Sequence, residues 1–162
     1  MKKVQTKVFR EKGITQIIST ISINAPKERV WDALKNIGDL QKFHPMVKKS
    51  HLVSKVSSGL GAKRYCDLKP MGSMEEIATE WDEGNSFTMK VIGGKMLPPY
   101  NTMNGTVSLV NTDMGTLVTF SFSYKLKFGA LGRLMDTIMI RPQFSKAPPK
   151  YVSGLKSYLE KD

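Results

Sequence analysis

The stretch that decides the fold ends the sequence: residues 128–162 read FGALGRLMDTIMIRPQFSKAPPKYVSGLKSYLEKD. Apolar residues return in it at spacings of three and four, a pattern typical of helices that bury one face. This pattern predicts one buried stripe of Leu131, Leu134, Met135, Ile138 and Met139, and a second of Val152, Leu155 and Leu159 with Tyr151 and Tyr158 beside them. On the other faces it places Arg133, Asp136, Lys156 and Glu160.

Prolines interrupt this C-terminal pattern. Pro142 and the pair Pro148-Pro149 each lack an N–H and clash with the preceding turn. We therefore expect two helices, or one sharply broken helix, rather than a continuous rod.

Upstream of residue 128 the sequence is mainly strand-like. Ile14 to Asn24 predicts a strand, and Pro26 then opens a short helix that ends before Gly38. A second short helix is expected over Asp39 to His44. Segments of period two, joined by short turns, follow at 46–56, 62–69, 73–81, 86–92, 100–110 and 116–128. Short turns make neighbours antiparallel, so we predict an α+β fold in which a curved antiparallel sheet of about seven strands wraps around the C-terminal helix.

Composition and charge bound the class of protein. A chain of 162 residues with 40% hydrophobic and 24% charged residues predicts one globular domain over residues 1–162. A single cysteine excludes an internal disulfide, and no window resembles a signal peptide or a transmembrane helix, so we expect a cytoplasmic protein. We also expect a monomer or weak dimer.

The net charge of +11 is concentrated in residues 1–13, 41–70 and 125–162. An anionic membrane surface is one candidate partner for these regions, and a solubilising surface is the alternative. Nucleic acid is not favoured, because no basic helix or platform of aromatic residues and arginine accompanies the charge.

Four stretches carry a resemblance to a known superfamily. They are ISINAP with VWDAL (21–26 and 30–34), GLGAKR (59–64), EIATEWD (76–82) and GLKSYLE (154–160). They resemble the SRPBCC superfamily, which includes START lipid-binding domains, the birch-pollen allergen group and polyketide cyclase/dehydrase-like proteins. The resemblance implies the helix-grip fold, with a cavity between sheet and C-terminal helix, and leaves the activity open because the fold hosts binders, transporters, receptors and enzymes.

Two segments look like those of plant abscisic-acid receptors, namely residues 47–52 and 91–94. The resemblance would place Lys48 at the ligand carboxylate and Glu76 at a water-linked acid. The receptor gate is replaced here by LKPMG (68–72) and the receptor latch by MLP (96–98), so hormone reception is not supported.

The strand alternation predicts which side chains face the helix. The predicted ligand-binding residues, with Lys48 and the two helical methionines added, are Lys48, Arg64, Cys66, Glu76, Phe87, Met89, Val91, Met103, Val107, Phe120, Phe122, Tyr124, Met135 and Met139. Methionines suit a cavity that adapts to irregular apolar ligands, although such residues also fill ordinary cores. If the side chains of Arg64 and Glu76 both point inward, they come within reach of each other. The pair would then be either a polar end that orients a ligand or a structural ion pair.

Several other sites are weighed from the sequence. We predict that Cys66 is a small buried group and that His44 lies either at the cavity mouth or at the surface. We expect no cofactor and no metal site, since neither a phosphate-binding glycine loop nor ligand spacing is present. Loops 93–99 and 69–72 are the candidate gate, through Met71, Met96 and Leu97.

The leading hypothesis is a carrier of a lipid, isoprenoid or polyketide. The alternative is a cyclase or dehydratase in which Arg64, Glu76 or Tyr124 acts on a carbonyl or a proton. A third possibility, an RNA- or protein-binding adaptor, rests on the charge alone.

Overall fold

The computed structural model describes residues 3–161. Within this range the chain forms eight strands followed by a helical C-terminal region. The strands are β1 (Gln5–Glu11), β2 (Ile14–Ile23), β3 (Val47–Leu52), β4 (Lys63–Leu68), β5 (Ser73–Asp82), β6 (Ser86–Lys95), β7 (Tyr100–Thr112) and β8 (Gly115–Leu126). The helices are α1 (Lys27–Lys35), the 3-10 helix η1 (Ile37–Lys42), α2 (Gly129–Met135), the π-helix η2 (Asp136–Ile140), α3 (Arg141–Phe144) and α4 (Ala147–Leu159).

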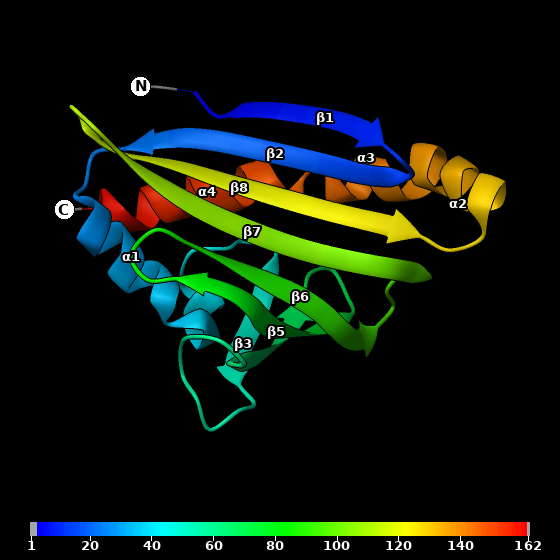
Figure 1. The fold of residues 1–162 in the computed structure, drawn as a ribbon, viewed down its shortest axis with the longest axis horizontal. Coiled ribbons are helices and arrows are strands. Elements are labelled where there is room, and N and C mark those ends of the chain that lie inside the picture. Colours follow the sequence, from blue (N-terminus) through cyan, green and yellow to red (C-terminus); the bar gives the residue numbers. More distant parts are fainter. Residues whose placement is uncertain (1–2, 162) are drawn as a thin grey trace.

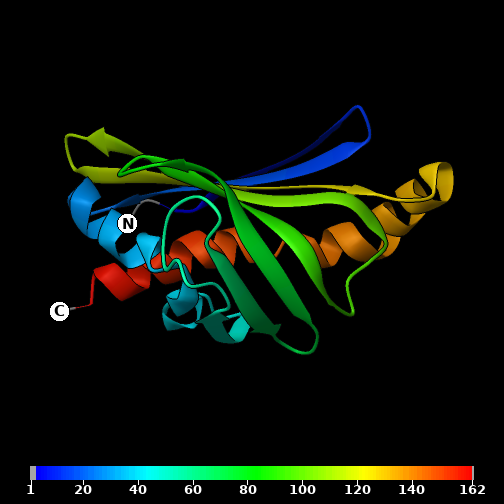
Figure 2. The ribbon, with the colours of Figure 1, turned by 60° about the horizontal axis from the view of Figure 1, so that its bottom comes forward.

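One antiparallel sheet holds all of these strands, in the order β1-β2-β8-β7-β6-β5-β4-β3. Figures 1 and 2 show that the sheet curves and that α4 crosses its concave side. Shifts in the pairing of β5 with β6 at Glu75/Glu76 and Ala78/Glu80 bend the sheet, because a bulged strand twists more strongly than a regular one. The predicted α+β helix-grip fold is confirmed.

The sheet has one strand more than the seven predicted. β1 pairs along its whole length with β2, yet all seven of its residues are exposed. A strand exposed on both faces carries no alternation of apolar and polar residues, so no local pattern predicts it.

The corner formed by α1 and η1 closes one end of the sheet. Trp31 of α1 packs edge-on against Trp81 and Phe87. The indole N–H groups of Trp31 and Trp81 both donate to Glu83, at 2.8 and 2.7 Å. Val30 and Leu34 of the same helix are buried, as their helical spacing predicts.

The two proline sites differ. At Pro142 the helix continues, because Ile140, Arg141 and Ser145 around it keep right-handed helical backbone angles. The Pro148-Pro149 pair lies in the first turn of α4, where a missing N–H costs little. α4 buries Tyr151, Val152, Leu155 and Leu159 against the sheet. This half of the predicted helix packing is confirmed.

The other half is wrong, because the helix over residues 129–140 buries the opposite face. Leu131, Leu134, Ile138 and Met139 are all more than half exposed, whereas Asp136 is 1% exposed. Gly132 faces the sheet so closely that a Cβ there would lie 2.0 Å from the carbonyl oxygen of Lys127.

A buried polar network holds this face of the helix inward. The Asp136 carboxylate accepts hydrogen bonds from the Thr15 hydroxyl at 2.8 Å, the Tyr124 hydroxyl at 2.5 Å and Arg141 Nη2 at 2.8 Å. Thr15 and Tyr124 are each 1% exposed, so their donors have no access to water. Burial alone would raise the pKa of Asp136, but these hydrogen bonds outweigh it and lower the pKa. Among residues 3–161, no helix is long and apolar enough to cross a bilayer.

Candidate functional site

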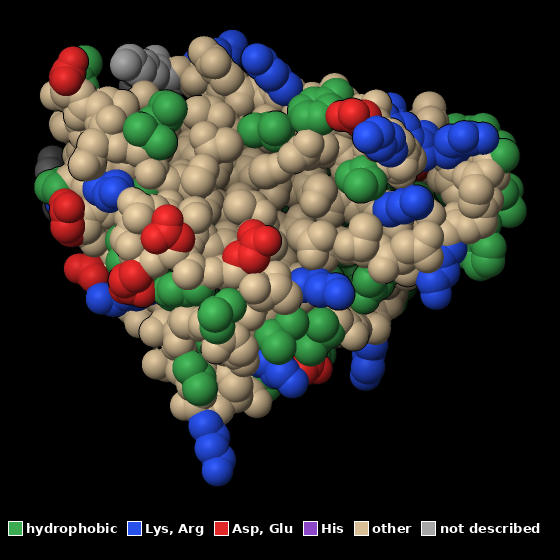
Figure 3. Space-filling model, viewed as in Figure 1, with side chains coloured by type: hydrophobic (Ala, Val, Ile, Leu, Met, Phe, Trp, Pro, Cys, Tyr) green, Lys and Arg blue, Asp and Glu red, His purple; other side chains and the backbone are tan. Residues whose placement is uncertain are grey.

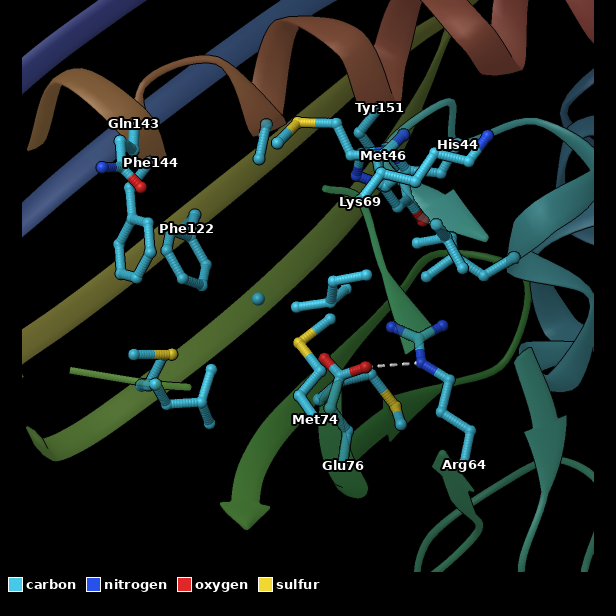
Figure 4. A pocket seen from close by; sticks show the side chains of 18 of the residues that line it. His44, Met46, Arg64, Lys69, Met74, Glu76, Phe122, Gln143, Phe144 and Tyr151 are labelled. Carbon is cyan, nitrogen blue, oxygen red and sulfur yellow. Dashed lines mark hydrogen bonds and ion pairs between the residues drawn. The ribbon is translucent and has the colours of Figure 1, made fainter. Parts of the chain in front are cut away.

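A cavity of about 220 Å³ lies between the concave side of the sheet and the start of α4. Figure 4 shows two ends: Phe122 and Phe144 at one, and Arg64, Glu76, His44 and Tyr151 at the other. The cavity is lined by Leu40, His44, Met46, Val47, Arg64, Leu68, Lys69, Pro70, Met71, Met74, Glu76, Phe87, Met89, Met96, Leu97, Met103, Gly105, Phe120, Phe122, Gln143, Phe144, Ala147 and Tyr151.

Half of the predicted ligand-binding residues lie on this wall. They come from neighbouring strands of the concave face, and they are Arg64, Glu76, Phe87, Met89, Met103, Phe120 and Phe122. Met71, Met96 and Leu97, the residues predicted for the gate, also line the cavity.

The remaining predicted residues lie elsewhere. Lys48 is exposed on β3, because the side chains of β3 that face inward are Val47 and Ser50. Cys66 and Val107 are packed in the main core, and Val91 is packed with Ile17 in a smaller cluster.

The residues predicted near the helix lie beyond the cavity as well. Tyr124 is buried beneath η2, where its hydroxyl donates a hydrogen bond to Asp136. Met135 is half-buried and Met139 is exposed, because the helix presents Gly132 and Asp136 to the sheet instead.

Arg64 and Glu76 form the polar end of the cavity. They face each other directly across β4 and β5, and Arg64 Nε donates to Glu76 Oε2 at 2.6 Å. Arg64 Nη1 also donates to the carbonyl of Ile37 at 3.3 Å. Burial alone would lower the pKa of Arg64, but the neighbouring Glu76 carboxylate raises it, so the guanidinium stays charged. A guanidinium has five N–H donors, so these two bonds leave donors that face the cavity.

His44 extends this polar end from the loop after η1. Burial, reinforced by the charges of Arg64 and Lys150, lowers the pKa of His44 to about 4. The imidazole is therefore neutral at pH 7. Its Nδ1 accepts a hydrogen bond from the Met46 N–H at 3.3 Å, which assigns the ring proton to Nε2. His44 is 7% exposed and lines the cavity, so it is not the surface residue that the sequence also allowed.

Tyr151 of α4 brings a hydroxyl to the same region. Its ring stacks on Phe120 at 4.1 Å between centroids and meets His44 edge-on at 5.6 Å. Tyr151 lines the cavity, and burial raises the pKa of its phenol, so the hydroxyl keeps its proton. The sequence pattern places Tyr151 only beside a core stripe. The tyrosine within an apolar stripe is the signal that could have identified this hydroxyl, because a buried tyrosine O–H needs a hydrogen-bond partner.

The opposite end of the cavity is aromatic. Phe122 of β8 and Phe144 of α3 meet edge-on, with ring centroids 5.4 Å apart. The sequence interpretation missed Phe144 and Gln143, since the proline-rich segment around them breaks the helical period.

The two loops predicted to form a gate meet beside the cavity. A Cβ on Gly72 would lie 2.9 Å from the Lys95 carbonyl oxygen, so the turn after β4 touches the loop after β6. Met71 is 60% exposed and Met96 is 73% exposed, although both line the cavity. The two loops of the predicted gate are therefore neighbours on the cavity wall.

The Cys66 thiol lies close to the polar end of the cavity, 4.0 Å from Glu76 Oε2. Burial raises the pKa of the Cys66 thiol to about 12, so it is protonated at neutral pH. Within residues 3–161, no cluster of three or more His, Cys, Asp or Glu side chains is arranged to hold a metal ion. Arg64, the Nε2–H of His44 and the Tyr151 hydroxyl supply hydrogen-bond donors at the polar end of the cavity.

Comparisons with known proteins give one family and one fold. A family model described as polyketide cyclase / dehydrase and lipid transport matches residues 15–160. The protein TTHA0849 from Thermus thermophilus has a similar structure, with a TM-score of 0.72 at 19% identity, over 89% of this chain and 96% of that one.

A plant protein gives a similar match. Two crystal structures of major latex-like protein 151 from Panax ginseng match at 14% identity, with TM-scores of 0.73 and 0.72. They cover 92% and 91% of this chain and 99% of the ginseng chains. No curated protein matches the chain. At these identities the solved structures show a shared fold.

Proposed function

Because the chain belongs to the polyketide cyclase / dehydrase and lipid transport family, we propose that it binds and carries a hydrophobic small molecule inside the cytoplasm. The single observation that carries the proposal is the cavity between sheet and α4, which has apolar walls and one polar end. Binding sites for small molecules share this design, since apolar walls provide affinity and a few polar groups provide orientation.

The polar end favours ligands with an oxygen acceptor. Arg64, the Nε2–H of His44 and the Tyr151 hydroxyl all supply hydrogen-bond donors at that end. A carbonyl, hydroxyl or carboxylate oxygen would satisfy them, while an apolar chain would extend toward Phe122 and Phe144. Lipids, isoprenoids and polyketides all have this combination of one oxygenated end and an apolar body.

The walls allow ligands of different shapes. Met74, Met89 and Met103 line the cavity, and methionine has three rotatable bonds and a polarisable sulfur. The cavity of about 220 Å³ is below the roughly 300 Å³ at which common ligand sites begin. We therefore expect these side chains, together with Met71 and Met96 of the predicted gate, to move outward when a ligand enters.

A second candidate, a cyclase or dehydratase, is favoured by the same polar end. In this version Arg64 and the Nε2–H of His44 would donate hydrogen bonds to a substrate carbonyl and stabilise the negative charge that develops on its oxygen. Tyr124 takes no part in this version, because its hydroxyl is bonded to Asp136 away from the cavity. An activity lost in His44→Gln while ligand binding persists would separate the enzyme from the carrier.

The test of the carrier is retention of an apolar molecule. Native mass spectrometry of protein purified from its own cells should show one apolar molecule per chain, and an environment-sensitive hydrophobic dye should bind with one site. Ala147→Phe fills the cavity from α4 and should weaken dye binding by about tenfold or more.

The matched control changes the same helix outside the cavity. Ser157 is exposed on α4, so Ser157→Phe should leave dye binding unchanged. A wild-type protein that retains no apolar molecule, binds no dye and shows no ligand-dependent rise in melting temperature would refute the carrier.

A further inference from the structure

A row of exposed apolar side chains covers the helix at one end of the sheet. Phe128, Leu131, Leu134, Ile138 and Met139, here called the apolar ridge, are 55–65% exposed. The spacing of Leu131, Leu134, Ile138 and Met139 places these four along one side of α2 and η2, and Phe128 directly precedes α2. Single exposed apolar residues are ordinary, but a contiguous group of this size marks an interaction site.

The exposure of the ridge is built into the fold. Rolling the helix to bury the ridge would pull Asp136 away from the buried hydroxyls of Thr15 and Tyr124. It would also move Gly132 off the Lys127 carbonyl, where no larger residue fits. The π-helical turn starts at Asp136, and such turns are frequent at functional sites. The chain thus buries a carboxylate and leaves large apolar side chains in water.

The shape of this end suits insertion rather than docking into a groove. Figures 1 and 2 show α2 projecting past the ends of β7 and β8 as a narrow protrusion. Side chains on a convex protrusion have little rigid protein surface to pack against. A fluid bilayer deforms around them, and helices with an apolar side and basic neighbours lie in its interface.

The surroundings of the ridge are basic. Lys125 and Lys127 at the end of β8 and Arg133 on α2 are exposed. The end of β1 and the turn to β2 add Arg10 and Lys12, which are also exposed, with the acidic Glu11 between them. That turn lies beside β8, since a Cβ on Gly13 would be 3.5 Å from Lys125 Cε. Figure 3 shows blue and green side chains gathered together at this end of the molecule.

We propose that this end docks on an anionic lipid bilayer, with the apolar ridge inserted into the headgroup region and the basic residues on lipid phosphates. The charge selects this occupant, because a basic rim attracts an anionic surface and repels a second copy of the same chain. This proposal goes beyond ligand binding, and it holds whether or not the cavity is filled.

Vesicle flotation with the full chain tests the docking. The protein should float with vesicles of phosphatidylcholine containing roughly 30% phosphatidylserine, and bind pure phosphatidylcholine at least about tenfold more weakly. Added salt should weaken binding to the anionic vesicles, because it screens the exposed charges. No flotation with anionic vesicles at low salt would overturn the proposal.

Two matched double variants locate the docking face. Leu134→Gln with Ile138→Gln removes two ridge side chains and should weaken vesicle binding by about 30-fold, as expected for two partly buried aliphatic groups. Val110→Gln with Met114→Gln, also at exposed apolar positions but at the opposite end of the sheet, should bind as the wild type does. Circular dichroism and melting temperature should be unchanged in both.

Either of two other outcomes would overturn the proposal. If the ridge variant binds vesicles as tightly as the control does, the docking face lies elsewhere. If the wild type self-associates in sedimentation, the ridge variant does not, and neither floats, the ridge is a contact between copies of the chain.

Discussion

Replacing Asp136 by alanine should cause a large loss of stability at a position that looks like a polar surface residue in the sequence. The carboxylate is 1% exposed and accepts hydrogen bonds from Thr15, Tyr124 and Arg141. Alanine removes the acceptor and leaves all three donors in place. Two of the donors are buried hydroxyls that cannot turn to water.

The magnitude follows from those donors. A buried donor without a partner costs about 1–3 kcal/mol, so the hydroxyls of Thr15 and Tyr124 together account for roughly 3–4 kcal/mol. Arg141 adds less, because its side chain is 31% exposed and can be solvated. A loss of this size corresponds to a fall in melting temperature of about 6–16 °C for a domain of this length. Asp136→Asn keeps one acceptor oxygen and should lose about half as much.

Urea unfolding at pH 7, followed by circular dichroism, measures the change. Thr137→Ala is the matched control, because Thr137 is the exposed neighbour and should change stability by less than about 0.5 kcal/mol. Hydrogen exchange gives a second readout: amides of residues 129–144 should lose protection in Asp136→Ala, since the network fastens that segment to the sheet.

The effect also has a predicted pH dependence. The pKa of Asp136 is lower in the folded protein than in the unfolded chain, so its contribution is complete above the unfolded pKa of about 3.9. It is lost as the pH falls through the folded pKa, and the gap between wild type and Asp136→Asn should narrow there. A loss below about 1 kcal/mol at pH 7, with unchanged exchange at 129–144, would refute this account of the network.

Three further results are expected. Folding lowers the pKa of His44 from 6.5 to about 4, so between these pH values the native state binds fewer protons than the unfolded state. The free energy of unfolding should therefore fall by up to about 3 kcal/mol as the pH drops from 6.5 to 4, and His44→Gln should abolish this dependence when denaturation is measured at a series of pH values. Arg64→Met should cost roughly 3–5 kcal/mol by leaving Glu76 buried and unpaired, whereas Arg64→Met with Glu76→Met should recover most of it; a double variant no more stable than the single one would contradict the pairing. On addition of an apolar ligand, hydrogen exchange should slow at residues 93–97 if they form a gate, and unchanged exchange there with protection elsewhere would place the entrance at another edge.

The fold is predictable because most strands have one wet and one covered face. The strand predicted over 14–24 is β2, Ile14–Ile23, and the strand predicted over 116–128 is β8, Gly115–Leu126. In each, the alternation is a local signal that any single strand carries by itself. β1 lacks this signal because its side chains are exposed on both faces, and it is attached to the sheet by backbone pairing with β2.

The cavity wall is predictable in part, since alternation tells which face a side chain takes but not how far along the strand the cavity reaches. Phe120, Phe122 and Tyr124 share a face of β8, yet only the first two line the cavity. Tyr124 lies past its end, beneath the helix that follows the strand. The depth of a residue within the sheet depends on what covers it, and that is decided by distant segments.

Helical periodicity alone does not predict that the apolar ridge is exposed. Helical spacing correctly groups Leu131, Leu134 and Ile138 on one side, but the choice of the buried side depends on Asp136. Its partner Thr15 is 121 positions away in the sequence. A buried carboxylate with well-placed donors can outweigh an apolar stripe, and no local pattern announces such donors.

The order of the strands also has a consequence for how the chain folds. β2 and β8 are neighbours in the sheet, and Thr20 and Thr119, 99 positions apart, hydrogen-bond across them. β3 to β8 follow one another through adjacent pairings and can form as successive hairpins, but the β2–β8 seam requires a loop that encloses most of the chain. During synthesis, the seam and α4 therefore complete the structure only after the last strand has emerged. Until then the concave face of the sheet is exposed to water. Chains shortened within α4 keep that face exposed, so they should aggregate, and no folded protein with weakened ligand binding should be recovered from them.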